Sequence, residues 1–307
     1  MTPAVLEDRA TGSVRLAIEA MATRFELVLP DAPAAGGSDR LRAIGEESLA
    51  EIARQDARLS AYRPASDISW INAHAGERAV KVEPGLFVLL QRCLALSKAT
   101  EGAFDISVGP LVRAWKFAGA GADVSRPLPS TGLIADARAR VGYQHVHLDP
   151  RTSTVRFGRS GMSIDLGAAG KGYAIDLAAT TLRQQGVTRA LLHGGTSSVH
   201  AIGAPADAAA WKIDWAAPAG MGRTFSVCNG ALSVSAVHGK AFTTEGHVYG
   251  HVIDPRTGWP TDAASSAIVT GPGSLECDAL STALLVLGVG WLPTLRERFP
   301  GYDGAAA

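Results

Sequence analysis

The spacing of hydrophobic and polar residues predicts both strands and helices along this chain. Residues 14–30 alternate between apolar and polar positions, as strands do, and the alternation breaks at Met21-Ala22-Thr23. Residues 41–59 carry apolar side chains at helical spacing, and a second helix is predicted to begin at Pro84 and run through residue 96. The last clear helix is predicted over residues 274–287. The first part of the chain is therefore expected to be a pair of strands followed by two helices.

The middle of the chain mixes the two kinds of element without a fixed order. A helix is predicted over residues 172–185, a strand over residues 190–192, and further strands over residues 211–215 and 225–228. No fixed-period repeat is visible. Because strands and helices alternate irregularly, the sequence predicts an α+β fold with mixed or antiparallel sheets, packed helices and two intimate subdomains, rather than a doubly wound parallel sheet.

Composition fits a globular protein and narrows the choice of partners. The chain has 307 residues, of which 47% are hydrophobic and 19% charged, enough for a sizeable core. The 29 basic and 29 acidic side chains balance, and no block of five or six like charges occurs. We therefore expect no nucleic-acid partner. Three widely separated cysteines argue against a disulfide framework or a structural zinc site.

Neither end of the chain nor its longest apolar run predicts membrane insertion. The run over residues 279–292 is interrupted by Ser281 and Thr282 and is shorter than the roughly 20 residues needed to span a bilayer. The first 15 residues include Glu7, Asp8 and Arg9 and lack the apolar core of a signal peptide. We therefore expect a cytoplasmic protein that does not insert into a membrane.

A glycine-rich segment with one lysine is the most informative motif. Residues 165–176 read DLGAAGKGYAID and place Lys171 at the start of the predicted helix. Free N–H groups at a helix start favour anions, and Lys171 adds a point charge there, which suggests phosphate chemistry. The segment is not a Walker loop, because Asp165 takes the place of the first glycine and Gly172 that of the metal-binding Ser or Thr. A tight strand-to-helix turn without a ligand is the competing interpretation.

Two further segments present polar groups in useful combinations. Asp278 and Thr282 are four residues apart, so a helix places them on one face as hard oxygen ligands of the type that suits magnesium. The alternative is that Asp278 complements the dipole of a helix N-terminus. The segment GHVIDPRTGWP, residues 250–260, brings His251, Asp254 and Arg256 into one turn-rich loop, which is otherwise read as structural.

Aromatic residues suggest where a flat ligand would lie. Trp115 follows a rigid Gly-Pro turn, and together with Tyr62 and Met21 it is a candidate surface for an aromatic ring system. Burial in the core is the competing interpretation for each of these three side chains.

Taken in this order, the segments resemble the FAD:protein FMN transferases, the ApbE-like family. The phrases that carry the resemblance are D-L-G-A-x-x-K-G-Y-A-x-D, H-x-I-D-P-R-T-G and D-A-L-x-T-A. The match begins at Met21-Ala22-Thr23 and ends at Asp278 to Thr282. The resemblance implies an ApbE-like domain over residues 15–300, with an N-terminal tail over residues 1–14 and a C-terminal tail over residues 301–307.

The resemblance also implies an activity and a set of site residues. The enzyme would bind FAD with Mg²⁺ at the pyrophosphate, pass FMN to a threonine hydroxyl of an acceptor protein, and release AMP. The side chains of Asp278 and Thr282 and the backbone carbonyl of Ala168 would bind the metal. His251 and Lys171 would assist the transfer. Contacts to FAD would come from Met21, Tyr62, Ala114, Trp115, Lys116, Asp165, Lys171 and Val252.

Two segments depart from the family pattern. Where the family has N-A-G-G and an acidic residue, this chain has His193-Gly194-Gly195-Thr196. Where the family has T-S-G-D, this chain has Val234-Ser235-Ala236-Val237. These departures keep two alternatives open, a magnesium-dependent FAD pyrophosphatase and a non-catalytic FAD-binding protein. A redox flavoenzyme is disfavoured because no nicotinamide fingerprint is present.

Overall fold

The computed structural model describes residues 4–8, 13–30, 37–117, 127–216, 222–237, 241–244 and 247–307. Its first described hairpin joins strand β2 (Ser13–Ala20) to strand β3 (Thr23–Leu29). The two residues between them, Met21 and Ala22, have φ angles of 50° and 58°. This left-handed pair is what a two-residue hairpin turn requires, because its twist matches that of the flanking strands. The predicted break in the strand pair is therefore confirmed.

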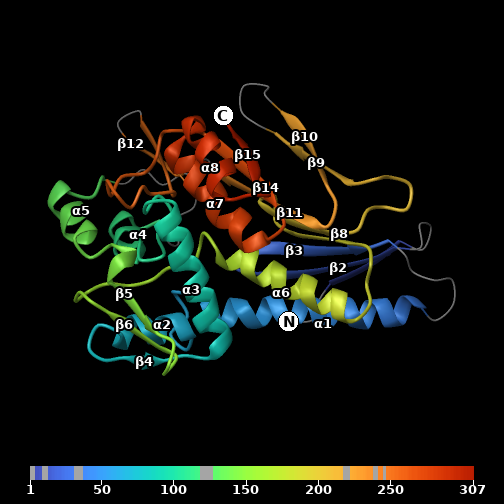
Figure 1. The fold of residues 1–307 in the computed structure, drawn as a ribbon, viewed down its shortest axis with the longest axis horizontal. Helices are drawn as coiled ribbons and strands as arrows, with labels where there is room; N and C mark the ends of the chain where they lie inside the picture. The colour runs from blue at the N-terminus through green and yellow to red at the C-terminus, as the bar shows by residue number, and fades with distance from the viewer. Residues whose placement is uncertain are drawn as a thin grey trace.

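An antiparallel sheet runs through the molecule (Figure 1), and its eight strands follow the order β1-β2-β3-β7-β8-β11-β14-β15. Every neighbouring pair in this sheet is antiparallel. The predicted α+β class is confirmed. The remaining strands of the sheet are β1 (Ala4–Asp8), β7 (Ala190–Gly194), β8 (Ser198–Ile202), β11 (Gly230–Ala236), β14 (Ser266–Gly271) and β15 (Asp303–Ala306).

The sheet also includes a short strand near each end of the chain. Strand β1, within the expected N-terminal tail, pairs with β2, and strand β15, within the expected C-terminal tail, pairs with β14. Both strands are short, at five and four residues. Their sequences are too brief to show alternation, so their strand conformation depends on the neighbouring strand that each one extends.

Three long helices lie along the sheet, as Figure 1 shows: α1 (Gly37–Leu59), α6 (Gly170–Gln184) and α7 (Ser274–Leu287). All three confirm predicted helices. Leu49 and Ile52 of α1 are fully buried against Ala174 and Ala178 of α6 and the strands beneath them. Small residues on α6 let the helices approach closely, and the Ser48 hydroxyl donates to the carbonyl of Ala178 at 3.0 Å.

A second group of elements lies beside the main sheet, with its own three-stranded sheet in the order β4-β6-β5. It contains α3, which confirms the helix predicted from Pro84. Its elements are α2 (Asp67–His74), β4 (Val80–Lys81), α3 (Pro84–Ala99), α4 (Gly109–Trp115), α5 (Thr131–Arg138), the 3₁₀ turn η1 (Tyr143–His145), β5 (Val146–Asp149) and β6 (Thr154–Phe157).

The remaining elements complete the fold around the C-terminal half. Strands β9 (Trp211–Trp215) and β10 (Arg223–Val227) form a hairpin that packs on the main sheet, where the Trp215 indole donates to the Ser266 hydroxyl at 3.1 Å. Strands β12 (Ala241–Thr244) and β13 (His247–Gly250) form another hairpin. Turn η3 (Val289–Trp291) and helix α8 (Leu292–Arg298) follow α7. No helix within the described residues has the length and apolar character needed to cross a membrane.

Candidate functional site

The two polar motifs that the sequence placed on different helices meet in the structure. The ammonium group of Lys171, at the start of α6, lies 3.4 Å from Oδ1 of Asp278 on α7. The backbone N–H of Gly172 donates to Oδ2 of the same carboxylate at 3.1 Å. Asp278 is only 2% exposed. A carboxylate and a lysine from segments more than 100 residues apart therefore form one site, at the N-terminus of a helix.

The start of α6 favours this arrangement for two reasons. No side chain caps the helix, so its first N–H groups need other acceptors, and a carboxylate there is also stabilised by the helix dipole. Gly172 further lets α6 approach α7 without a gap. A Cβ built on Gly172 would lie 2.2 Å from the carbonyl oxygen of Ser274. Any other residue at position 172 would hold the two helices apart.

Thr282 lies one turn after Asp278, on the same face of α7, as its spacing predicts. Its hydroxyl is 3.2 Å from the backbone carbonyl of Asp278 and 3.1 Å from the hydroxyl of Ser235 on β11. The Ser235 hydroxyl also lies 2.9 Å from that of Ser281. Ser235 belongs to a segment that departs from the family pattern, yet it supplies a hydroxyl to this site. Its sequence signal was available, since serine is the residue that this segment shares with T-S-G-D.

Tyr62 and Asp165, each predicted separately to contact FAD, lie side by side in the structure. The Tyr62 phenol, on a residue that is 60% exposed, donates to Oδ2 of Asp165 at 3.4 Å. Partial burial of the phenol and the charge of Asp165 raise the pKa of Tyr62 to about 12, so the group keeps its proton at neutral pH. Asp165 also accepts the N–H of Gly167, in the turn that contains Ala168. Met21, in the β2–β3 turn, donates its N–H to Asp56 at 2.9 Å.

Trp115 does not form the expected aromatic surface with Tyr62 and Met21. Its ring is 1% exposed and lies among Phe117, Phe242, Tyr249 and Trp259. The indole N–H donates to the carbonyl of Gly258 at 2.8 Å. Trp115 therefore supports the loop that follows His251 from the core side. Ala114 is buried beside it, and Lys116 ends helix α4 with a left-handed φ of 51°.

The loop after β13 is held by its own charged residues. Asp254 is buried and accepts the backbone N–H of Arg256 and two bonds from its guanidinium, at 2.8 and 2.9 Å. The Arg256 charge, a candidate anion clamp in the sequence, is thus paired within the loop. His251 and Val252 are half-buried where this loop leaves β13. The Val252 carbonyl accepts the N–H of Thr261 at 2.9 Å, which closes the loop.

A cavity of about 530 Å³ lies near this loop and is lined by residues that include Asp105, Tyr143 and Arg256. None of the residues predicted to contact FAD or the metal lines it. Asp105 there is already satisfied by Ser107 and by the N–H of Tyr143. The chemistry concentrates instead at Lys171 and Asp278, so we place the functional site there.

A third predicted motif residue, Asp176, holds the start of α7. Its carboxylate accepts the N–H groups of Ser274 at 2.8 Å and Leu275 at 3.0 Å. The residue that precedes α7 is Gly273, which has no side chain to cap the helix, so the cap comes from α6. Sequence reasoning quoted Asp176 as the end of the motif but gave it no role. The sequence signal available for this role was the position of Asp176, one helical turn after Gly172.

We expect this cap to make stability depend on pH. Burial by itself raises the pKa of Asp176, but the bonds from His200, Leu275 and Ser274 outweigh burial, so the pKa is lowered. A lowered pKa in the folded state means that the stabilisation is present above the unfolded pKa and is lost as pH falls through the folded value. Urea unfolding of the wild type and of Asp176→Asn should differ by about 1–2 kcal/mol at pH 7, the usual size of a cap effect. The difference should shrink towards pH 3, and a difference that is constant with pH would contradict this account.

Comparisons with known proteins show which family this chain resembles. The ApbE family model matches residues 21–304. The FAD:protein FMN transferase of Treponema pallidum is 32% identical over 277 residues, covering 84% of this chain and 75% of that protein. One from Klebsiella pneumoniae is 33% identical over 246 residues, covering 78% and 73%. The solved structure of the ApbE protein of Thermotoga maritima aligns with a TM-score of 0.85 at 27% identity, covering 96% of this chain and 94% of that one.

Proposed function

This chain belongs to the ApbE family and is a flavin transferase, and we propose that it moves FMN from FAD to a threonine hydroxyl of an acceptor protein. The reaction requires Mg²⁺ and releases AMP. The observation that carries the proposal is the meeting of Lys171, the N–H of Gly172 and the buried Asp278. A lysine and a helix start favour phosphate, and a carboxylate beside them favours a cation.

The residues at this site fit a magnesium ion that is shared with a phosphate ligand. Asp278 would supply a carboxylate and Thr282 a hydroxyl from α7, and Ala168 would supply a backbone carbonyl from the turn before α6. No cluster of three or more His, Cys, Asp or Glu side chains occurs among the described residues. Magnesium commonly uses one or two carboxylates together with substrate phosphates, so a single carboxylate with neutral oxygens suits it better than a transition metal. When bound, the ion neutralises charge on the pyrophosphate.

The protein residues divide the remaining work of phosphoryl transfer. The acceptor threonine oxygen forms a bond to the FMN phosphorus, and the bond from that phosphorus to the AMP oxygen breaks. Lys171 stabilises negative charge on the phosphates, and its place next to Asp278 holds the ammonium at the site. His251 accepts the threonine proton. Tyr62 and Asp165, which share a hydrogen bond, contact FAD.

A second function, hydrolysis of FAD to FMN and AMP, uses the same residues with water in place of the threonine hydroxyl. The observation that favours hydrolysis is the loss of polar and acidic residues in the two segments that depart from the family pattern, residues 193–196 and 234–237. Val234 and Val237 are apolar where the family has polar and acidic residues, and Thr196 stands at the family's acidic position. Ser235 alone keeps a hydroxyl beside Thr282.

The two functions separate in one assay. Purified protein is mixed with FAD and Mg²⁺, and AMP release is followed with and without a threonine-bearing acceptor protein. We expect AMP release that depends on the acceptor and an acceptor mass that rises by one FMN. AMP and free FMN without acceptor would support the hydrolase instead. Bound FAD with no AMP in either mixture would contradict both enzymatic functions.

A further inference from the structure

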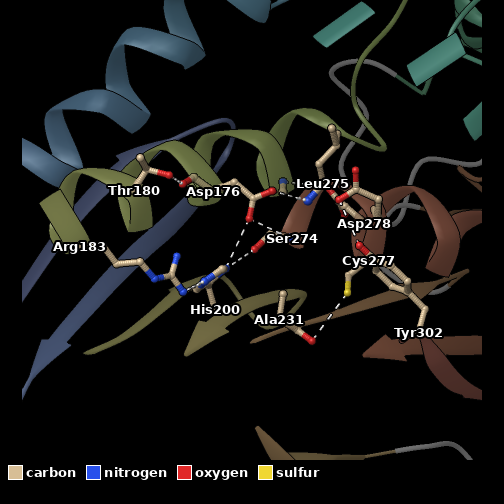
Figure 2. Close-up of polar contacts among 12 residues, drawn as sticks. Asp176, Thr180, Arg183, His200, Ala231, Ser274, Leu275, Cys277, Asp278 and Tyr302 are labelled. Carbon is tan, nitrogen blue, oxygen red and sulfur yellow. Dashed lines mark hydrogen bonds and ion pairs between the residues drawn. The ribbon is translucent and has the colours of Figure 1, made fainter. Parts of the chain in front are cut away.

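A buried polar network lies next to the Lys171–Asp278 pair and joins α6, α7 and β8 (Figure 2). His200 of β8 is 3% exposed, and its Nδ1 lies 2.7 Å from the Ser274 hydroxyl and 3.4 Å from Oδ1 of Asp176. Its Nε2 lies 2.9 Å from the guanidinium of Arg183. Serine, histidine and aspartate are the residue types of a catalytic triad, so a second catalytic centre has to be considered first.

The geometry excludes a triad. In a triad the serine and the carboxylate contact opposite nitrogens of the imidazole, whereas here both lie at Nδ1. Arg183 can only donate, so Nε2 must accept and the imidazole proton lies on Nδ1, directed at Ser274 and Asp176. Ser274 is fully buried, so its hydroxyl is not presented to solvent as a triad nucleophile would be. The network therefore has a structural role. Arg183 orients the imidazole of His200, and the imidazole in turn orients Ser274 and Asp176.

What this network fixes is the place of α7 relative to α6. Asp176 holds the first two N–H groups of α7, and four residues earlier on α6 the N–H of Gly172 holds Asp278, which lies four residues after Ser274. The two helices are thus joined by hydrogen bonds at two levels one turn apart, Asp176 with Ser274 and Gly172 with Asp278. Because a helix turn is rigid on this scale, the position of Ser274 determines where the Asp278 carboxylate lies.

We infer that Asp176, oriented by His200, is a positioning residue that holds the Asp278 carboxylate in place for the cation and the phosphates. This inference rests on the proposed function, because it assigns Asp176 a role in that same site. Mutation of a residue that orients a metal ligand commonly lowers metal affinity by about 10- to 100-fold. Asp176 acts on Asp278 through the helix backbone, so we expect an effect at the lower end, about tenfold.

The test is a titration of Mn²⁺, used as a paramagnetic probe, into the FAD-loaded protein, with free Mn²⁺ measured by electron paramagnetic resonance. Asp176→Asn keeps the shape of the side chain but places an amide N–H where an acceptor is needed. Ser48→Ala is the matched control, because it removes a buried hydrogen bond to the opposite side of α6 at Ala178 and leaves α7 untouched. We expect Mn²⁺ to bind about tenfold more weakly to Asp176→Asn and with unchanged affinity to Ser48→Ala.

Each other outcome has a definite meaning. Equal Mn²⁺ affinity in Asp176→Asn and the wild type, or an equal loss in both variants, would show that Asp176 contributes only stability. If Asp176→Asn does not fold, His200→Gln gives a milder change, and unaltered affinity there overturns the inference. If the wild type binds no Mn²⁺, the metal site of the proposed function is wrong and this inference fails with it.

Discussion

Replacing Asp278 by asparagine is expected to lower magnesium-dependent AMP release by about 1000-fold, the largest effect of any single change considered. The substitution keeps the size of the side chain and removes the negative charge. A metal ion supplies several kcal/mol of charge stabilisation in the transition state, and each 1.36 kcal/mol corresponds to about a factor of ten in rate. The same change leaves one acceptor oxygen in place of two for the Lys171 ammonium and the N–H of Gly172. The measurement is the rate of AMP release at saturating FAD over a range of Mg²⁺ concentrations.

Glu276→Gln is the matched control for this experiment. Glu276 is also an acidic residue of α7, but it pairs with Arg92 and Tyr302, away from the Lys171–Asp278 pair. We expect its rate to stay within about threefold of the wild type, since a partly exposed ion pair contributes about 0–1 kcal/mol. If Asp278→Asn retained magnesium-dependent turnover close to that of Glu276→Gln, the metal assignment of Asp278 would be wrong.

Gly172→Ala is expected to have the second-largest effect, on stability and on activity together. The added methyl group would lie 2.2 Å from the carbonyl oxygen of Ser274 and 2.9 Å from Cα of Leu275. These are backbone atoms, so α6 and α7 must move apart. Overpacking of this kind costs about 1–3 kcal/mol. A displacement of about 1 Å at a catalytic group lowers the reaction rate by about 100-fold. We therefore expect the rate of AMP release to fall by about 100-fold.

A glycine with open space around it provides the comparison. Gly132 lies in α5, and a Cβ there would meet nothing within 4 Å. Gly132→Ala should therefore leave activity unchanged and stabilise the fold by up to about 1 kcal/mol through the unfolded chain. Thermal unfolding and AMP release are measured for both variants. A Gly172→Ala protein as stable and active as Gly132→Ala would show that the close approach of α6 and α7 has no functional consequence.

Several features of the fold could be predicted from local sequence alone. Helices α1, α3, α6 and α7 were predicted from local sequence, α1 by its apolar spacing and α3 by Pro84 in its first turn. The β2–β3 turn was predicted by the break at Met21-Ala22-Thr23. Helix α8 was not predicted, because a segment of seven residues carries too little periodicity. Trp115 has the same residue type whether it lines a ligand site or fills a core, and only its neighbours Phe117, Phe242 and Tyr249 decide that it is buried.

By itself, the sequence predicted the longer helices, the first pair of strands and the family. Periodic burial is a local property, and the pairing of Asp278 with Thr282 on one helix face follows from a spacing of four. Only the tertiary structure decided which distant groups meet. Lys171 reaches Asp278, and Ser235 reaches Thr282, because the sheet order β8-β11-β14 sets β11 under α7 while Gly172 lets α6 close upon it. Such contacts depend on how whole elements pack, and no short stretch of sequence contains that information.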